Sequence, residues 1–298
     1  MFLDTPAIRI SNLKKYFGVG PRRVKAVDDI TFSVPRGEIF GFLGKNGAGK
    51  TTTIRCLMNF IHPTGGNISL LGKNAQNNAV ELKHKIGYLS GNVQFNKRWT
   101  GQEHIDYYSK IYSNAQGAKT LIDRLNFDPS IKTKQLSSGN RQKLGIILAL
   151  MHNPRLILLD EPTNALDPLL QQTVYELLEE ARDCGATVFM SSHNLTEVER
   201  ICDRVAIIKD GKLVATETIA SLNRKHLYTV KVRFSRTIDD LDLQIQNTTV
   251  ELRDGAYARL SVKGEIAPVL NELSRMPVSD IEIHHASLEE IFLEYYQT

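Results

Sequence analysis

The most constraining feature of the sequence is a glycine-rich octapeptide, Gly44–Thr51, which fits the spacing G-x-x-x-x-G-K-[ST]. It follows an apolar run, Glu38–Leu43, that is expected to form a buried strand, and it opens Lys50–Phe60, which is expected to form a helix ended by His62-Pro63. A strand, a glycine turn and a helix in this order direct backbone N–H groups and a helix N-terminus at an anion. The octapeptide therefore predicts a phosphate-binding loop in an α/β domain.

This loop predicts a site for the phosphates of a nucleotide and for Mg²⁺. Lys50 would reach the β- and γ-phosphates, and the Thr51 hydroxyl would ligate Mg²⁺. A glycine turn that merely precedes a helix has the same spacing, but the flanking strand and helix favour the phosphate-binding interpretation. The predicted nucleotide-binding residues are Gly44, Asn46, Gly47, Ala48, Gly49, Lys50, Thr51 and Thr52.

A second motif is an apolar run that ends in two carboxylates, Leu156–Leu159 followed by Asp160 and Glu161. This pattern is typical of a Walker B strand. Asp160 would hold Mg²⁺, directly or through water. Glu161, one residue further on, would orient or deprotonate the attacking water. A structural strand that ends at a solvent-exposed acidic turn would give the same sequence pattern. The phosphate-binding loop upstream makes the Walker B interpretation the more favourable one.

The remaining pattern predicts an α/β core followed by a small α+β appendage. Residues 80–150 are expected to be mostly helical, and after about residue 222 short alternating segments begin. We expect domains at 1–222, with a helical subdomain at about 85–150, and at 223–298. The other predicted strands are Ile8–Leu13, Ile30–Val34, Thr187–Met190, Val205–Ile208, Tyr228–Phe234 and Ala258–Val262.

Three further motifs appear in a fixed order around the Walker B strand. Leu136–Lys143 resembles the ABC signature, Asp160–Pro168 resembles Walker B continuing into a D-loop, and Ser191-Ser192-His193 resembles a switch histidine. Together with the phosphate-binding loop they cover about the first 220 residues. The chain therefore resembles the ATP-binding subunits of ABC transporters. The resemblance implies a P-loop NTPase cassette with a RecA-like core and with antiparallel β and helical subdomains.

The resemblance also implies roles that periodicity does not show. In this family two subunits sandwich two ATP molecules head to tail, so Ser137 and Gly139 would contact the γ-phosphate bound by a second ATPase subunit. His193 would contact the γ-phosphate in its own subunit, and Asp167 would link the two sites. The family stacks adenine on an aromatic residue, for which the candidates are Tyr16, which we favour, and Phe17.

The sequence departs from the family pattern at three places. Lys45 stands where proline is usual, and Ser138 and Asn140 replace glycine and glutamine in the signature, a variant common in one exporter branch. After Ile86–Leu89 the family expects a Q-loop glutamine that ligates Mg²⁺. Here Gly91 falls at about that place and Gln94 comes three residues later, so either Gln94 reaches back to the metal or a water replaces the side chain.

Two segments are expected to mark the membrane partner. Ala286–Leu293 resembles the ending of ATPase subunits of ABC-2 type exporters, whose permease is a separate polypeptide. Leu288, Ile291 and Phe292 of this segment, with Tyr295 after it, form an apolar helical stripe. The stripe must be buried against this domain or against a second copy of the chain. In the family the groove around the Q-loop receives the permease. We expect Phe95 and Trp99 to line it beside Lys97 and Arg98, although Trp99 in the subdomain core is an equal alternative.

Charge and composition exclude some other classes. The net charge is +4, with 7 Lys and Arg against 12 Asp and Glu from residue 226 onward, so the first 225 residues carry +9. No apolar run reaches the roughly 18 residues of a membrane span. The N-terminus lacks a signal-peptide layout. Cys56, Cys184 and Cys202 have no metal-ligand spacing, which favours a reduced chain. We expect a cytoplasmic protein at the inner face of the membrane, attached through its permease.

Other members of the same family act on ribosomes or on DNA. Those that act on ribosomes carry two cassettes, whereas this chain has one phosphate-binding loop and one signature. Those that repair DNA carry long coiled coils, and no heptad run of that length lies between Thr51 and Leu136. An importer is disfavoured by the exporter-like tail. We therefore expect export of an unknown substrate, with no nucleic-acid partner.

Overall fold

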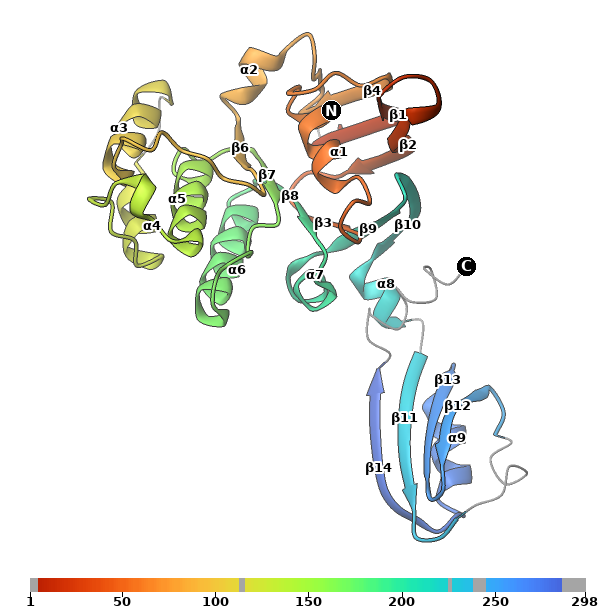
Figure 1. The fold of residues 1–298 in the computed structure, drawn as a ribbon. Helices are drawn as coiled ribbons and strands as arrows, with labels where there is room; N and C mark the ends of the chain where they lie inside the picture. The colour runs from red at the N-terminus through yellow and green to blue at the C-terminus, as the bar shows by residue number, and fades with distance from the viewer. Residues whose placement is uncertain (1–4, 113–115, 225–226, 238–244, 286–298) are drawn as a thin grey trace. The chain divides into compact units, whose positions relative to one another are not determined.

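The computed structural model describes residues 5–112, 116–224, 227–237 and 245–285 (Figure 1). The chain divides into two compact units, residues 1–216 and 217–298. This division lies a few residues before the one expected from the sequence, and it assigns helix α8 (Ile219–Arg224) to the second unit. The predicted apolar stripe at residues 288–295 and the exporter-like tail lie outside the described residues.

The first unit is built on a six-stranded sheet with the order β10-β9-β3-β8-β7-β6. The four neighbouring pairs from β9 to β6 are parallel, so their carboxyl ends meet at one edge. The central strands are buried along their whole length, as the apolar runs predicted. The strands are β3 (Ile39–Leu43), β6 (Ile86–Leu89), β7 (Leu156–Asp160), β8 (Thr187–Ser192), β9 (Arg204–Lys209) and β10 (Lys212–Thr218).

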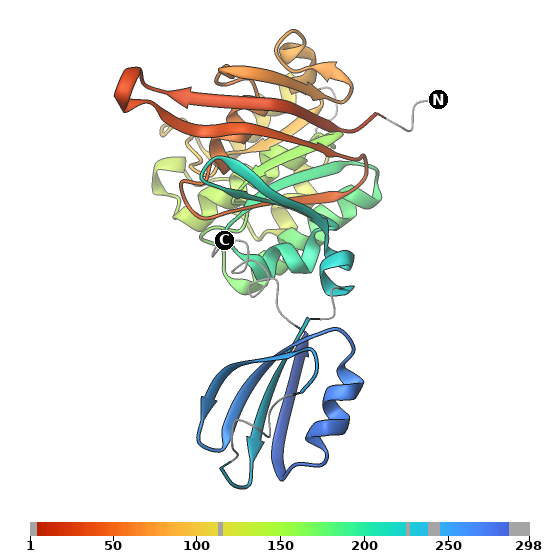
Figure 2. The same cartoon turned by 90° about the vertical axis from the view of Figure 1, so that its right-hand side faces the viewer.

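An antiparallel sheet with the order β2-β1-β4-β5 forms a second layer of this unit, drawn in red to orange in Figure 2. Its strands are β1 (Ile8–Phe17), β2 (Val24–Val34), β4 (Gly65–Leu70) and β5 (Lys73–Asn74). β1 and β2 are longer than expected because their ends pair with each other through polar residues, beyond the apolar runs. The rings of Phe32, Phe40, Phe42 and Phe189 join the two sheets, with centroids 5.4–6.2 Å apart.

Helices surround the central sheet. The phosphate-binding loop leads into α1 (Lys50–Leu57), which ends before Phe60 because Asn59 has a left-handed φ of 53°. The helical subdomain contains α3 (Gly101–Ile111), α4 (Ala118–Arg124) and α5 (Ser138–Leu150), which stand together at one side in Figure 1. The other helices are α2 (Ala79–Lys83), α6 (Pro168–Asp183) and α7 (Leu195–Ile201). Within the described ranges no helix is long and apolar enough to span a membrane.

The second unit has its own sheet and core. Its strands β11 (Leu227–Phe234), β12 (Thr248–Asp254), β13 (Tyr257–Lys263) and β14 (Val278–His285) are antiparallel in the order β12-β13-β11-β14. Alternate residues such as Val230, Val232 and Leu260 pack with Val269 of α9 (Ile266–Leu273). This alternation is the pattern that the sequence showed after residue 222.

Candidate nucleotide site

A cavity of about 520 Å³ lies at the carboxyl ends of the parallel strands, where β3 leads into the phosphate-binding loop. Nine of the predicted site residues line it: Asn46, Gly47, Gly49, Lys50, Thr51, Thr52, Asp160, Glu161 and His193. The other lining residues are Ala26, Lys45, Arg55, Ser90, Gly91, Asn92 and Asn164. The topology therefore brings the phosphate-binding loop together with two motifs that lie more than a hundred residues later in the sequence.

The glycines let the loop approach its neighbours closely. Gly49 has a φ of 112°, and a Cβ at this position would come 2.4 Å from the carbonyl oxygen of Ala26. Only glycine fits such a position without a backbone shift. Gly44 and Ala48 are buried beneath the loop and do not line the cavity. They support the loop and shape it for a phosphate.

Lys50 is buried, with a side chain only 5% exposed, and its ammonium group has two kinds of partner. It donates to the carbonyl oxygen of Gly44 at 2.6 Å, and it forms an ion pair with Glu161 Oε1 at 3.2 Å. A buried ammonium in a loop of backbone N–H groups is a strong point of attraction for phosphate oxygens.

Asp160 is fully buried at the end of β7 and is held by two hydroxyl groups. Thr51 donates to its Oδ2 at 2.8 Å, and Ser191 donates to its Oδ1 at 2.6 Å. A carboxylate with a hydroxyl beside it offers the hard oxygen ligands that Mg²⁺ prefers. The residues present therefore fit a magnesium ion bound by Thr51 and Asp160.

Glu161 is held in an unusual backbone conformation, with a φ of 53°. Its N–H donates to the carbonyl oxygen of Ser191 at 3.2 Å, and its own carbonyl accepts from Gln142 of α5 at 3.1 Å. A non-glycine residue in this region is strained and persists because its surroundings fix it. The side chain contacts Lys50 through one oxygen and His193 Nδ1 through the other, at 2.6 Å. Glu161 thus lies between the phosphate-binding lysine and the switch histidine.

The predicted signature and D-loop residues do not line this cavity. Ser137 caps α5 by accepting from the N–H of Asn140 at 3.2 Å, and Asp167 caps α6 by accepting from the N–H of Leu170 at 3.0 Å. Both are exposed, and Gly139 is partly exposed in the first turn of α5. Their contact with a nucleotide in a second subunit stays a prediction.

The structure does not bring Tyr16 into the cavity. Its hydroxyl donates to Asp28, a hydrogen bond that raises the pKa of Tyr16 and lowers that of Asp28. The guanidinium group of Arg23 covers its ring, with the carbon 4.3 Å from the centroid. Phe17, the alternative, is 43% exposed and lies outside the cavity as well. The part of the antiparallel sheet that does line the cavity is Ala26.

The structure also leaves Gln94 outside the cavity, as an exposed residue three positions beyond Gly91. Ser90, Gly91 and Asn92 line the cavity in its place. A Cβ on Gly91 would come 3.0 Å from Asp160 Oδ2, so the chain passes directly beside the Asp160 carboxylate here. Gly91 therefore occupies the expected Q-loop position without supplying a side-chain ligand.

The sequence did not predict the residues that orient the site through hydrogen bonds without lying at the functional positions of the motifs. Ser191 orients Asp160, and Gln142 fixes the backbone after it through the carbonyl oxygens of Glu161 and Pro162. Both residues belong to motifs that the sequence identified, Ser191 to the switch-histidine motif and Gln142 to the signature. Their hydrogen-bond partners could not be predicted, because these depend on how the strands and α5 pack. Arg55 could have been found, because it lies one helical turn after Thr51.

Comparisons with known proteins agree with this geometry. The model of the ABC transporter family matches residues 27–164. The chain is 33% identical over 299 residues to the bacitracin transport ATP-binding protein BcrA of Bacillus licheniformis, with 96% of each chain covered. It is 36% identical over 297 residues to an ABC transporter ATP-binding protein of Methanocaldococcus jannaschii, with 97% and 99% covered.

Solved structures show the same fold. An ATP-binding subunit of an ABC transporter superposes with a TM-score of 0.67 at 28% identity, covering 74% of this chain and 92% of that one. A dimeric ATP-binding cassette bound to ADP and phosphate superposes with a TM-score of 0.66 at 23% identity, covering 71% and 98%. The chain therefore belongs to the family of ABC transporter ATP-binding proteins and is an ATPase.

Proposed function

We propose that this ATPase powers export of a substrate through a separate ABC-2 type permease at the inner face of the cell membrane. The observation that carries the proposal is the arrangement of Lys50, Glu161 and His193 in one cavity, with Ser137 and Asp167 exposed outside it. Such a chain supplies one part of each of two nucleotide sites, and a second subunit has to supply the other part of each. A relative named for bacitracin transport supports export.

In the proposed mechanism the phosphates of ATP exchange the partners of Lys50. The ammonium group leaves Glu161 and binds the β- and γ-phosphates, which frees a Glu161 carboxylate oxygen to accept a proton from the attacking water. Thr51 and Asp160 would hold Mg²⁺, which when bound neutralises charge on the phosphate oxygens. His193 keeps Glu161 oriented through its Nδ1 and presents the other ring edge to the γ-phosphate.

Closure of the dimer completes the site. Ser137 and Gly139 of each subunit would face the γ-phosphate held by the other subunit, where the hydroxyl and the first turn of α5 favour an anion. Asp167 would connect the two sites. The second subunit is either a copy of this chain or a related one, and closure would move the attached permease.

The direct test is co-expression with a multi-helix membrane protein encoded beside this chain, followed by purification in detergent. We expect the two to purify together and the ATPase rate to respond to the permease. ATP-dependent uptake into inverted vesicles, with bacitracin as the first probe, then tests export. An active ATPase that never retains a membrane protein would contradict the transport proposal but would leave the ATPase assignment intact.

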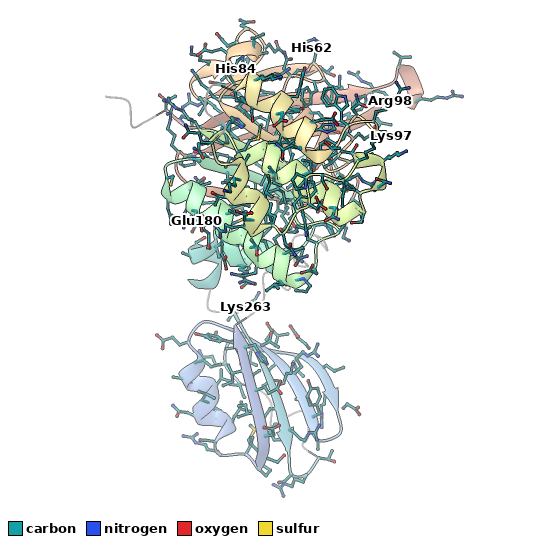
Figure 3. All side chains as sticks on the ribbon, turned by 90° about the vertical axis from the view of Figure 1, so that its left-hand side faces the viewer. His62, His84, Lys97, Arg98, Glu180 and Lys263 are labelled. Atoms are coloured by element: carbon teal, nitrogen blue, oxygen red, sulfur yellow. The ribbon has the colours of Figure 1, made fainter. Side chains whose placement is uncertain are left out.

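Trp99 is a candidate anchor for the permease. Its ring lies 5.1 Å from that of His104 and 5.4 Å from that of Tyr107, which is 49% exposed, while Trp99 itself is partly buried. Lys97 and Arg98 lie beside each other at the periphery of the unit in Figure 3. Aromatic residues and Arg are enriched at the cores of protein interfaces.

We expect Trp99→Ala to weaken co-purification of the permease while the ATPase rate of the chain alone stays within about twofold, because anchor residues carry binding energy that catalysis does not use. Tyr257→Ala, in the second unit, serves as an aromatic control. A lower melting temperature with unchanged assembly would show instead that Trp99 is a core residue.

The position of Gln94 gives a second prediction. Because its side chain is exposed outside the cavity, Gln94→Ala should leave the Mg²⁺ concentration at half-maximal ATP binding unchanged within about twofold, whereas Thr51→Val should raise it several-fold. A magnesium titration with fluorescent ATP measures both. An equal rise in the two variants would mean that Gln94 reaches back to the metal after all.

A further inference from the structure

Glu197 is a buried carboxylate with no role in the mechanism above. It lies in α7 and is only 3% exposed. Its Oε1 accepts a hydrogen bond from the Thr163 hydroxyl at 2.8 Å, and its Oε2 accepts one from the Ser192 hydroxyl at 2.5 Å. Burial raises the pKa of Glu197, which shows that this environment is costly for a carboxylate.

One partner of Glu197 lies in the loop that follows Glu161, and the other is the last residue of β8, next to His193. Thr163 follows Glu161 by two residues and begins the segment that leads to Asp167. Ser192 immediately precedes His193, and its hydroxyl also accepts from the N–H of Asn194 at 2.9 Å. One buried carboxylate therefore joins the loop after β7 to the end of β8, immediately before His193.

This connection extends on both sides. The carbonyl oxygen of Thr163 accepts from the N–H of Leu166 at 3.2 Å, one residue before Asp167. On the other side, Ser192 is followed by His193, and the His193 ring contacts Glu161. The contacts therefore lead from Glu161 along the loop to Thr163, through Glu197 to Ser192, and back to Glu161 through His193. An apolar side chain would fill this site without the desolvation cost of a carboxylate, so packing alone does not explain its presence.

We propose that Glu197 is a positioning residue that fixes the switch-histidine loop to the segment leading to Asp167. Through it, movement of that segment on contact with the second subunit reaches His193 and Glu161. The proposal rests on the site roles given above, since Glu197 does not line the nucleotide cavity itself. Energetic coupling of this kind requires contiguous hydrogen-bonded contacts, which Thr163, Glu197 and Ser192 supply.

Two substitutions of matched size test the proposal. Glu197→Leu fills the volume but accepts no hydrogen bond, and Glu197→Gln keeps an acceptor and adds a donor that either hydroxyl can accept. We expect kcat to fall about tenfold in Glu197→Leu, since small misplacements of catalytic groups cost up to ~10² in rate, while the Kd for MgATP stays within about twofold. Glu197→Gln should recover most of the rate. Glu199→Leu, on the same helix, is the control.

A second readout separates positioning from folding. In a Glu161→Gln background, Glu197→Leu should weaken the ATP-dependent dimer, and Glu197→Gln should not. Thr163→Val removes a single hydroxyl and remains informative where the Leu variant fails to fold. Its effect on kcat should be less than additive with that of Glu197→Leu, because both break the same link.

Three results would overturn the proposal: an unchanged kcat in folded Glu197→Leu, additive losses in the double variant, or a rate that recovers fully on cooling below the melting transition. The wild-type chain and Glu161→Gln are assayed alongside. A failure of Glu161→Gln to slow hydrolysis would refute the site roles themselves, which distinguishes it from a failure of the Glu197 link.

Discussion

Glu161→Gln is expected to slow ATP hydrolysis by about 10²–10⁴-fold, the usual contribution of a positioned general base, while MgATP still binds. The glutamine keeps the shape of the side chain but accepts no proton. Asp160, one residue earlier, is buried and tied to Thr51 and Ser191, so it is committed to the metal. The Glu161 carboxylate contacts Lys50 and His193, and once ATP engages Lys50 it would be available to act on water.

The ion pair between Glu161 and Lys50 adds a second expectation. The ammonium group of Lys50 lies 3.2 Å from Glu161 Oε1, so ATP must compete with this carboxylate for Lys50. Neutralising Glu161 removes both that competition and the repulsion of the triphosphate. We therefore expect the affinity for MgATP to rise in Glu161→Gln and the closed dimer to accumulate with ATP.

Single-turnover hydrolysis, equilibrium binding and ATP-dependent size exclusion measure these effects separately. Asp160→Asn is the matched comparison, because it neutralises the neighbouring carboxylate and should weaken MgATP binding as well as turnover. Near wild-type turnover in Glu161→Gln would mean that the base lies elsewhere, with His193 the next candidate. Loss of binding in this variant would make Glu161 a metal-site or structural residue.

The core of the site could be predicted from the sequence because each motif carries its own local geometry. The spacing of Gly44–Thr51 requires a turn between a strand and a helix, and a buried strand delivers Asp160 and Glu161 to the same sheet edge. Parallel pairing of β7 and β8 then brings His193 beside Glu161. The observed cavity follows from these three constraints together.

The positions of Tyr16 and Gln94 could not be predicted, because each depends on a loop whose path no motif fixes. The polar residues after Leu13 extend β1 to Phe17, which places Tyr16 opposite Lys25 and its hydroxyl on Asp28. Gly91 lies directly beside Asp160 and Asn92 still lines the cavity, but Gln94, three residues after Gly91, is exposed outside it. Propensity and spacing do not report such tertiary contacts.

The hydrogen bonds of Glu197 around the motifs could not be predicted from the sequence either. The sequence indicates only that Glu197 is an acidic residue in the first turn of a helix, where negative charge is common. Only the packing of α7 against β3 and β8 turns it inward to Thr163 and Ser192. The strands of the second unit, by contrast, were visible from their period-two alternation, since that pattern is local.

Lys50→Ala is expected to abolish MgATP binding at millimolar concentrations. Removing one member of a buried, hydrogen-bonded charge pair typically costs about 2–5 kcal/mol, or roughly 30-fold to several thousand-fold in Kd. The loss has two parts here: the phosphates lose their buried cation, and the Glu161 carboxylate is left uncompensated where the γ-phosphate must lie. Lys45→Ala, at an exposed lysine of the same loop, should change Kd by only a few-fold because solvent and salt screen its charge.

The two parts of this loss can be separated by adding Glu161→Gln to Lys50→Ala. If the uncompensated carboxylate contributes, the double variant should bind MgATP more tightly than Lys50→Ala alone, although more weakly than Glu161→Gln alone. Isothermal titration of the four chains gives the coupling free energy between the two residues, and thermal melting confirms that each is folded. A wild-type Kd in Lys50→Ala would show that this loop is not the nucleotide site. A double variant no better than Lys50→Ala would assign the whole effect to the lost contact between ammonium and phosphate, with no share from Glu161.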